Sequence, residues 1–356
     1  MRVFTCENCG QLIFFDNSRC LRCDTPLGYV HEQRDVVALR ELADGRLVDL
    51  ATPTGTWQRC ATADLTGCNW LVPAGSTALC ASCQLTRTRP ADSDAAGLTE
   101  LVQSEMAKRR LVFQLAELGL PVEPRREATK TGLAFDLLSS SETKVVTGHD
   151  DGIITLDLAE ADDEHRERLR LQLSEPYRTV LGHFRHEIGH YYWDRLVRDG
   201  GSTEACRAVF GDERANYAEA LERHYKNGPP GDWSNRFISA YASSHPWEDF
   251  AETWAHYLHI VDALETARSY GIDVRARFMP DASAAKIDFN PYTAPSAERL
   301  VEAWIPLTVA LNGVNRSMGH GDLYPFVLNQ PVMRKLEFVH DLIGDGRAAK
   351  ETPAAA

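Results

Sequence analysis

The residues with the clearest capacity for chemistry are two histidines and a glutamate in the run HEIGH. His186 and His190 are four positions apart, and Glu187 follows the first histidine. On an α-helix, residues four apart lie about 40° from each other on one face, so both imidazoles can reach the same metal ion. Zinc in such a site lowers the pKa of a bound water to about 7, and a nearby carboxylate can take the proton. The spacing predicts two zinc ligands, with Glu187 as the general base of a hydrolytic reaction.

A zinc site of this kind needs a third protein ligand. Position 196, where one large class of zinc peptidases has a histidine, holds Leu196. The segment HPWEDFAETWAHYLH offers a glutamate, because Pro246 suits the first position of a helix on which Glu248 and Glu252 lie one turn apart. We expect Glu248 to complete a site of two histidines and one glutamate, with an open position for water. We expect Glu252 to accept a hydrogen bond from a ligating imidazole.

Eight of the nine cysteines fall within the first 83 residues. The first four form two CxxC pairs separated by ten residues, which is typical of a zinc ribbon in which two such turns face each other across a tetrahedral metal site. Because so short a segment buries little apolar surface, a structural zinc would contribute on the order of 10 kcal/mol to its folding. The predicted ligands are Cys6, Cys9, Cys20 and Cys23.

The next four cysteines form a looser group, Cys60, Cys68, Cys80 and Cys83, in which only the last pair is a CxxC. Seven residues separate the first two, enough for a hairpin that brings both sulfurs to one metal. We predict a second structural zinc here, with buried free thiols as the alternative. Redox chemistry is disfavoured, because neither CxxC pair opens a helix in a strand-helix-strand pattern.

The composition is that of a globular protein, with 44% hydrophobic and 25% charged residues. A formal net charge of -13 argues against nucleic acid as a partner, and the first 90 residues are balanced, with nine arginines and nine acidic residues. No run of 18 apolar residues predicts a membrane span, and no export signal accompanies the cysteines. We expect a cytoplasmic protein that binds neither membrane nor nucleic acid.

The elements around these residues predict an α+β fold. Helical periodicity runs from Thr99 to Leu118, two short strands are expected at 132–138 and 152–158, and helices dominate from Pro176 to about Ile343. The strand at 152–158 could be an edge strand that pairs with an extended substrate, or a buried strand with no free edge. The expected divisions are a zinc ribbon at 1–30, a second cysteine-rich module at 31–90, a linker at 91–97, a mainly helical peptidase domain with a small β-sheet at 98–345, and a flexible tail at 346–356.

Three segments together resemble a known bacterial family. CENCGQLIFFDNSRCLRC, HFRHEIGHYYWDRLV and HPWEDFAETWAHYLH look like zinc-binding metallopeptidases that combine an N-terminal zinc ribbon with a peptidase domain. HEIGH followed by EDFAE more distantly resembles the catalytic domain of anthrax lethal factor, a gluzincin with a zincin-like fold. That resemblance implies Glu248 as the third ligand and Tyr241, seven residues earlier, as the hydrogen-bond donor to the transition state. Asp249 departs from the distant relative, which has an apolar residue there.

The function expected from these features is hydrolysis of a peptide bond by zinc-activated water, with one catalytic and one or two structural zinc ions. The partner would be a peptide or protein substrate. An alternative is that the zinc ribbons dock a partner protein and the peptidase-like domain is latent or regulatory. Hydrolysis of a non-peptide amide by the same site is a third reading.

Overall fold

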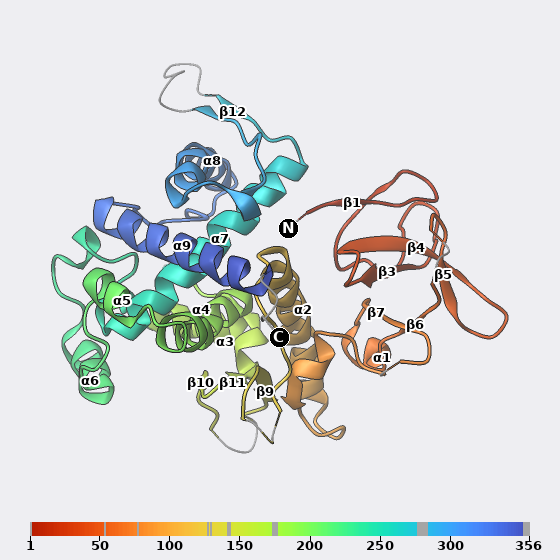
Figure 1. Ribbon diagram of the computed structural model, residues 1–356, viewed down its shortest axis with the longest axis horizontal. Helices are drawn as coiled ribbons and strands as arrows, with labels where there is room; N and C mark the ends of the chain where they lie inside the picture. Colours follow the sequence, from red (N-terminus) through yellow and green to blue (C-terminus); the bar gives the residue numbers. More distant parts are fainter. Residues whose placement is uncertain are drawn as a thin grey trace. The chain divides into compact units, whose positions relative to one another are not determined.

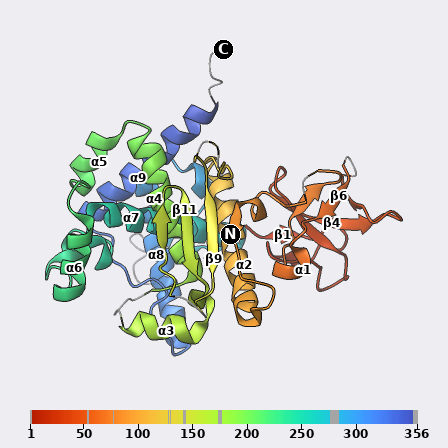
Figure 2. The ribbon, with the colours of Figure 1, turned by 90° about the horizontal axis from the view of Figure 1, so that it is seen from below.

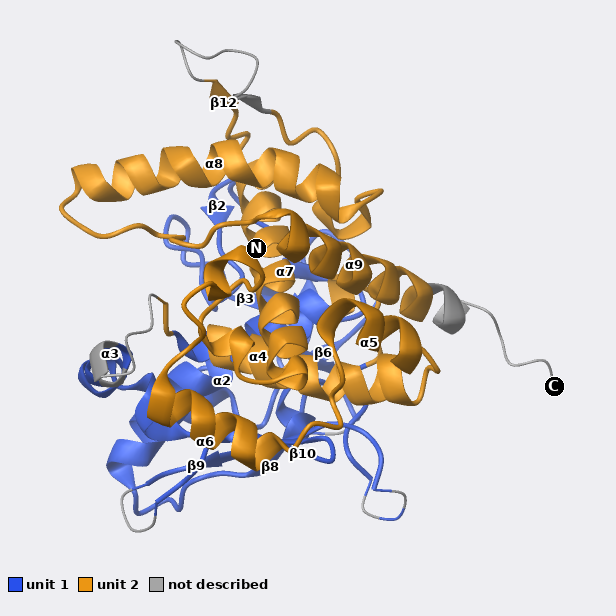
Figure 3. Ribbon diagram, turned by 90° about the vertical axis from the view of Figure 1, so that its left-hand side faces the viewer, with its two compact units in different colours: residues 1–115, 122–173, 179–181 blue, residues 116–121, 174–178, 182–356 orange. Residues whose placement is uncertain are grey.

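A computed structural model describes residues 2–52, 55–76, 78–126, 128, 130–140, 144–172, 177–275 and 284–351. The chain divides into two compact units, shown in different colours in Figure 3. The first comprises residues 1–115, 122–173 and 179–181, and the second comprises residues 116–121, 174–178 and 182–356. The division cuts helices α2 (Ala95–Glu117) and α4 (Val180–Tyr192) near one end of each.

The cysteine-rich part of the first unit is built from short antiparallel strands. A two-stranded β1-β2 hairpin precedes a five-stranded sheet in the order β3-β4-β5-β6-β7. Apolar side chains from β3, β4, β5 and β7 form a small core. Its members are Val30, Val37, Leu39, Leu47 and Leu71. The strands are β1 (Phe4–Thr5), β2 (Leu12–Ile13), β3 (Leu27–Val30), β4 (Asp35–Glu41), β5 (Leu47–Asp49), β6 (Trp57–Arg59) and β7 (Leu71–Pro73).

An aromatic cluster joins this region to helix α2. Phe113 of α2 has its ring centroid 4.9 Å from that of Phe15 and 5.7 Å from that of Tyr29, which in turn lies 4.6 Å from Trp70. All four side chains are buried. Residues on both sides of the expected linker at 91–97 therefore share one core, and α2 begins at Ala95, inside that segment. The polar composition of residues 91–97 therefore does not mark the end of this core.

A four-stranded sheet, also in the first unit, has the order β10-β11-β9-β8. Figure 2 shows β11 (Ile153–Asp157) beside β9 (Ala134–Leu138), to which it is parallel. On its other side β11 pairs with the antiparallel strand β10 (Gly148–Asp150), and β8 (Thr86–Thr88) forms the opposite edge. Of the two alternatives for 152–158, the structure has the strand with no free edge, because β10 and β9 pair with its two sides.

Strand β10 was missed because it is short and polar and because TGHDDG has the composition of a turn. The signal that could have found it is the pair Asp151 and Gly152, whose φ angles are 44° and 82°. Two consecutive residues with positive φ form the tight turn that suits a β-hairpin, and Asp-Gly is a preferred sequence for it. The turn therefore returns the chain directly from β10 into β11.

The second unit is mainly helical and is organised around α7 (Pro246–Ser269), which contacts α5, α8 and α9 (Figure 1). Helix α7 is buried on most sides, and Phe250 and Trp254 have no exposed surface. Its start is set by Pro246 in the first turn and by His245, whose side chain accepts a hydrogen bond from the Trp247 amide. The other helices are the π-helical segment η3 (Trp193–Arg198), α5 (Thr203–Phe210), α6 (Tyr217–Asn227), α8 (Ala297–Ser317) and α9 (Gln330–Glu351).

The remaining elements are short. They are α1 (Ala63–Thr66) and α3 (Asp163–Gln172) in the first unit, the β12-β13 pair (Val274–Arg275 and Ala284–Ala285) in the second, and single turns of 3₁₀-helix. Pro176, where a helix could begin, lies outside the described residues, and α4 starts at Val180. Helix α9 continues to Glu351, beyond the expected start of the tail. None of the helices within the described residues is long and apolar enough to cross a membrane.

Candidate metal centre

Helices α4 and α7 approach each other closely at a glycine of the HEIGH run. A Cβ atom placed on Gly189 would lie 3.0 Å from the Cα of Ala251 and 3.2 Å from the Cβ of Trp254. Such distances are shorter than ordinary van der Waals contact, so only glycine fits here without moving a helix. The contact brings the histidine face of α4 against the glutamate face of α7.

His186, His190 and Glu248 converge at this contact. Glu248 Oε2 lies 3.0 Å from His186 Nε2 and 3.6 Å from His190 Nε2, and one ligand atom from each residue falls within 4.8 Å of the others. Two ligand atoms bound tetrahedrally to zinc at their usual distances are about 3.3 Å apart. Glu248 is 1% exposed, so its carboxylate sits in a site with little access to water. The three residues fit a zinc ion, with no fourth protein ligand among the described residues.

The Nδ1 atom of His186 points to a second carboxylate. It lies 2.8 Å from Glu252 Oε1, and the hydroxyl of Ser239 donates to Glu252 Oε2 at 2.5 Å. Ser239 is itself fixed, because its oxygen accepts a hydrogen bond from the Ala242 amide at 3.0 Å. With Nδ1 engaged by Glu252, Nε2 of His186 is the nitrogen left for a metal. Sequence reasoning missed Ser239, which no spacing rule links to the helices.

Glu187 lies between His186 and His190 in the sequence, and its side chain is buried. Burial raises the pKa of Glu187 above its ordinary value, while His186 and His190 oppose the rise. Tyr241 lies nearby, with its ring centroid 5.9 Å from that of His186. Among the residues that the structure describes, the Tyr241 hydroxyl has no hydrogen-bond partner. Burial, followed by the charge of Glu248, raises the pKa of Tyr241, which keeps its hydroxyl protonated.

Tyr217 is a residue of the site that sequence reasoning missed. Its hydroxyl donates to Glu248 Oε1 at 2.6 Å, from the first residue of α6. It lies 31 positions before Glu248, at the start of a helix whose surface is mostly exposed, and no feature of the sequence marks it.

Asp249, next to the predicted ligand, is not part of this group. Its Oδ2 lies 2.7 Å from the ammonium nitrogen of Lys335 on α9, and Asp249 is fully buried. Burial raises the pKa of Asp249 to about 7, against the effect of Lys335. Lys335 also donates to the backbone oxygen of Arg236 at 2.7 Å. The pair ties α7 to α9.

The other histidines of α7 have partners of their own. His256 Nδ1 lies 2.7 Å from the Tyr324 hydroxyl, and His259 Nδ1 accepts from Arg185 at 2.7 Å. His245 Nε2 contacts the backbone oxygen of Ala215 at 3.0 Å. None of the three belongs to a metal-ligand group of the described residues.

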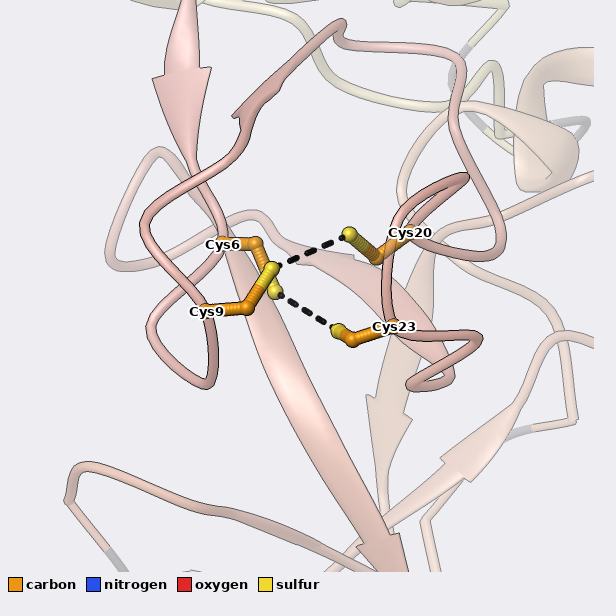
Figure 4. A group of neighbouring side chains, drawn as sticks. All are labelled: Cys6, Cys9, Cys20 and Cys23. Atoms are coloured by element: carbon orange, nitrogen blue, oxygen red, sulfur yellow. Dashed lines mark hydrogen bonds between the residues drawn. The ribbon is translucent and has the colours of Figure 1, made fainter.

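The first cysteine cluster is shown in Figure 4, where two turns bring their sulfur atoms together. The Sγ atoms of Cys6 and Cys23 are 3.8 Å apart, and those of Cys9 and Cys20 are 3.6 Å apart. A disulfide would require about 2.05 Å, whereas sulfurs bound tetrahedrally to zinc are about 3.8 Å apart. The Thr25 hydroxyl lies 3.1 Å from Cys23 Sγ, close enough to donate to a thiolate. The geometry fits zinc.

The second cysteine cluster is more deeply placed, with all four residues buried. Cys68 Sγ lies 3.8 Å from Cys80 Sγ and 3.7 Å from Cys83 Sγ, again the spacing of a tetrahedral zinc site. The segment between Cys60 and Cys68 is the short helix α1 rather than the expected hairpin, and it ends at Gly67 in a left-handed conformation. This turn redirects the chain to bring the sulfur of Cys68 into the group.

A buried arginine accompanies the second cluster. Arg109 of α2 is 3% exposed, donates from Nη2 to the Thr66 backbone oxygen at 3.3 Å, and lies within electrostatic range of Cys68. Neither its Nε nor its Nη1 has a hydrogen-bond partner among the described residues. Four thiolates around one zinc carry a net charge of about -2, which a buried cation stabilises. The guanidinium therefore suits a zinc-thiolate group better than four neutral thiols.

The chain matches two protein families and has close relatives in mycobacteria. Residues 98–342 match the family described as "Putative zinc-binding metallo-peptidase", and residues 3–94 match a zinc-ribbon domain. A protein of Mycobacterium tuberculosis strain H37Rv, named as uncharacterized, is 47% identical over 348 residues, covering 97% of this chain and 96% of the relative. A Mycobacterium bovis protein, also named as uncharacterized, has the same identity and coverage. No solved structure matches the chain.

Two independent observations support zinc as the cofactor. The matched families are a zinc-binding peptidase and a zinc ribbon, and the described residues contain two groups of four cysteines and one group of two histidines and a glutamate. The peptidase match covers well over half of the chain. This chain belongs to the family of zinc-binding metallopeptidases that carry an N-terminal zinc ribbon.

Proposed function

We propose that this protein hydrolyses peptide bonds with zinc-activated water, and that His186, His190 and Glu248 hold the catalytic metal. The observation that carries the proposal is the convergence of ligand atoms from two helices within 4.8 Å, next to a buried carboxylate. Zinc held there would polarise the carbonyl of the substrate and lower the pKa of a bound water to about 7. Two histidines and a downstream glutamate are the ligand set of a gluzincin, and we infer a zincin-like arrangement for residues 98–345.

Glu187 is the proposed general base. It neighbours His186 in the chain, and the raised pKa that burial gives its carboxyl suits a group that takes a proton from water and then passes it to the leaving amine. Tyr241 is the proposed donor to the negative charge that develops on the carbonyl oxygen. It is supported by its place beside His186 and by a hydroxyl that no described residue engages.

The test is a Glu187→Gln variant of the full chain. We expect it to retain zinc but to lose cleavage of a peptide library, scored by mass spectrometry of the products, by roughly a hundredfold or more. Glu222→Gln on α6 is the matched control, since Glu222 is an exposed glutamate. Undiminished cleavage by zinc-loaded Glu187→Gln would exclude this mechanism. Products from small amides alone would assign the site to a non-peptide amide.

A second candidate function is partner binding through the zinc ribbon, with a latent peptidase domain. The observation that favours it is the exposure of large apolar side chains around the first cysteine cluster, where Leu12 is 40%, Phe14 is 53% and Leu21 is 90% exposed. If the zinc-loaded chain cleaves no member of a broad peptide library, while a Leu21→Ser, Phe14→Ser variant loses a partner that the parent chain retains, this function is favoured.

A further inference from the structure

The two oxygens of the Glu248 carboxylate have different neighbours. Oε2 faces both imidazoles, at 3.0 Å from His186 Nε2 and 3.6 Å from His190 Nε2. Oε1 accepts the hydrogen bond from the Tyr217 hydroxyl at 2.6 Å. A hydroxyl that donates to a carboxylate at this distance makes one of the stronger hydrogen bonds in proteins, with a preferred direction. The bond therefore decides which oxygen is presented to the metal.

The position of Tyr217 is fixed from two sides. Its ring lies edge-on to His245, with centroids 5.3 Å apart, and edge-on to Trp247, with centroids 5.8 Å apart. His245 also holds the Ala215 backbone oxygen at 3.0 Å, two residues before Tyr217. The N-terminus of α6 is thus attached to the N-terminus of α7, the helix that carries Glu248. Tyr217 has the support needed to orient a ligand rather than to move freely at the surface.

The two tyrosines at the site differ in what their hydroxyls do. The Tyr217 hydroxyl is already engaged by Glu248, whereas that of Tyr241 has no partner among the described residues. The Tyr217 hydroxyl already donates to Glu248 and can hold that residue in place, whereas the Tyr241 hydroxyl is available to a substrate.

We propose that Tyr217 is a positioning residue that holds Glu248 with a single oxygen toward the zinc. The inference rests on the proposed catalytic zinc site and assigns to it a residue of α6. A carboxylate that binds through one oxygen leaves a coordination position open, which a hydrolytic site requires for water. Hydrogen bonds to metal ligands commonly contribute a factor of about 10 to 100 in metal affinity.

The experiment is zinc retention by the full chain under increasing concentrations of a chelator, measured by metal analysis. The parent chain should hold three zinc ions, one for each ligand group. In Tyr217→Phe we expect one zinc to leave at roughly tenfold lower chelator concentration, while the two zinc ions of the cysteine clusters stay as in the parent. These two ions are an internal control, because general destabilisation would release them as well. A midpoint for the third zinc equal to that of the parent overturns the proposal.

Two further variants complete the test. Tyr225→Phe, on the same helix and with Tyr225 63% exposed, should behave as the parent chain. Glu248→Ala separates this inference from the proposed function, because it should remove the third zinc altogether. If Glu248→Ala keeps three zinc ions, the proposed catalytic site itself fails. If Glu248→Ala loses one while Tyr217→Phe retains all three as the parent does, the role of Tyr217 alone is rejected.

Discussion

The cysteine clusters and the His186, His190, Glu248 group present their metal-ligand atoms with opposite architectures. Each cysteine cluster takes its four ligands from a segment of 24 residues or fewer. The strands of this region are only two to seven residues long. The histidine and glutamate ligands come from two long helices, and 62 positions separate His186 from Glu248. Helix α7 is held by buried side chains such as Phe250 and Trp254. We therefore expect zinc to contribute to folding in the clusters and to bind an already packed fold at the helical site.

The largest expected effect breaks this comparison at a cysteine. Cys80→Ser removes a buried ligand of the second cluster and forfeits much of a zinc-binding free energy on the order of 10 kcal/mol, so we expect the cysteine-rich region to unfold. Glu248→Ala should lose its zinc with little change in helical content. Circular dichroism with metal analysis measures both. Equal loss of structure in the two variants would show that the helical site also depends on its metal.

The Lys335–Asp249 pair tests whether contacts other than metal binding fix the position of α7, the helix that carries Glu248. Lys335→Met leaves the Asp249 carboxylate buried without its cation, which should destabilise the protein by about 3 kcal/mol in denaturant unfolding. The double variant Lys335→Met, Asp249→Asn removes the charge as well and should recover part of that loss. A single variant as stable as the parent would mean that the pair contributes nothing to fixing α7.

Gly189 tests how closely α4 and α7, the helices that carry the proposed metal ligands, must approach each other. Gly189→Ala places a methyl group against Ala251 and Trp254, and the overpacking should cost about 1–3 kcal/mol and weaken zinc binding at the helical site alone. Gly313→Ala is the control, because Gly313 lies in α8 with no heavy atom within 4 Å of an added Cβ. That substitution should stabilise the protein by about 0.5–1 kcal/mol. If both variants bind zinc as the parent does, the close approach is not needed.

The smallest effect concerns the charge of the second cluster. Arg109→Met should expose the second cluster's cysteines to alkylation several-fold faster, a change of about 1 kcal/mol, while Cys6, Cys9, Cys20 and Cys23 react as before. Mass spectrometry of each labelled cysteine measures this. The opposite result is equally informative: if the cluster is not a zinc-thiolate, removing a buried guanidinium with unsatisfied N–H groups should stabilise the first unit.

How far the sequence predicts this molecule depends on how local each feature is. The HEIGH spacing and the turn of helix between Glu248 and Glu252 are local, so helical geometry alone places those side chains on faces that can share a metal. The convergence of the two faces is not local, because it depends on the space left by Gly189 beside Ala251. The partnership of Tyr217 with Glu248 depends on the path of a loop and could not be predicted.

The fold shows the same limit. The strands at 134–138 and 153–157 were expected within a residue or two, since continuous apolar runs predict buried strands. The order of these strands in the sheet was not predicted, because β10 is a three-residue polar strand that adds little to the hydrophobic pattern of the sequence. The expected linker at 91–97 shows a related limit. The two family matches meet between residues 94 and 98, inside this segment, yet Phe113 beyond it packs on Phe15 before it.

The second cysteine cluster is connected to strand β8, and through this strand its state should affect the solubility of the protein. Cys83 opens a turn of 3₁₀-helix, Cys83–Leu85, that leads without interruption into β8, the outer strand of the four-stranded sheet. Release of Cys83 would therefore free this strand and uncover the edge of β9, whose sequence AFDLL is mostly apolar. An uncovered apolar edge recruits strands from other chains. We expect oxidation or chelation at this cluster to cause aggregation of the protein, even when the proposed catalytic residues are intact.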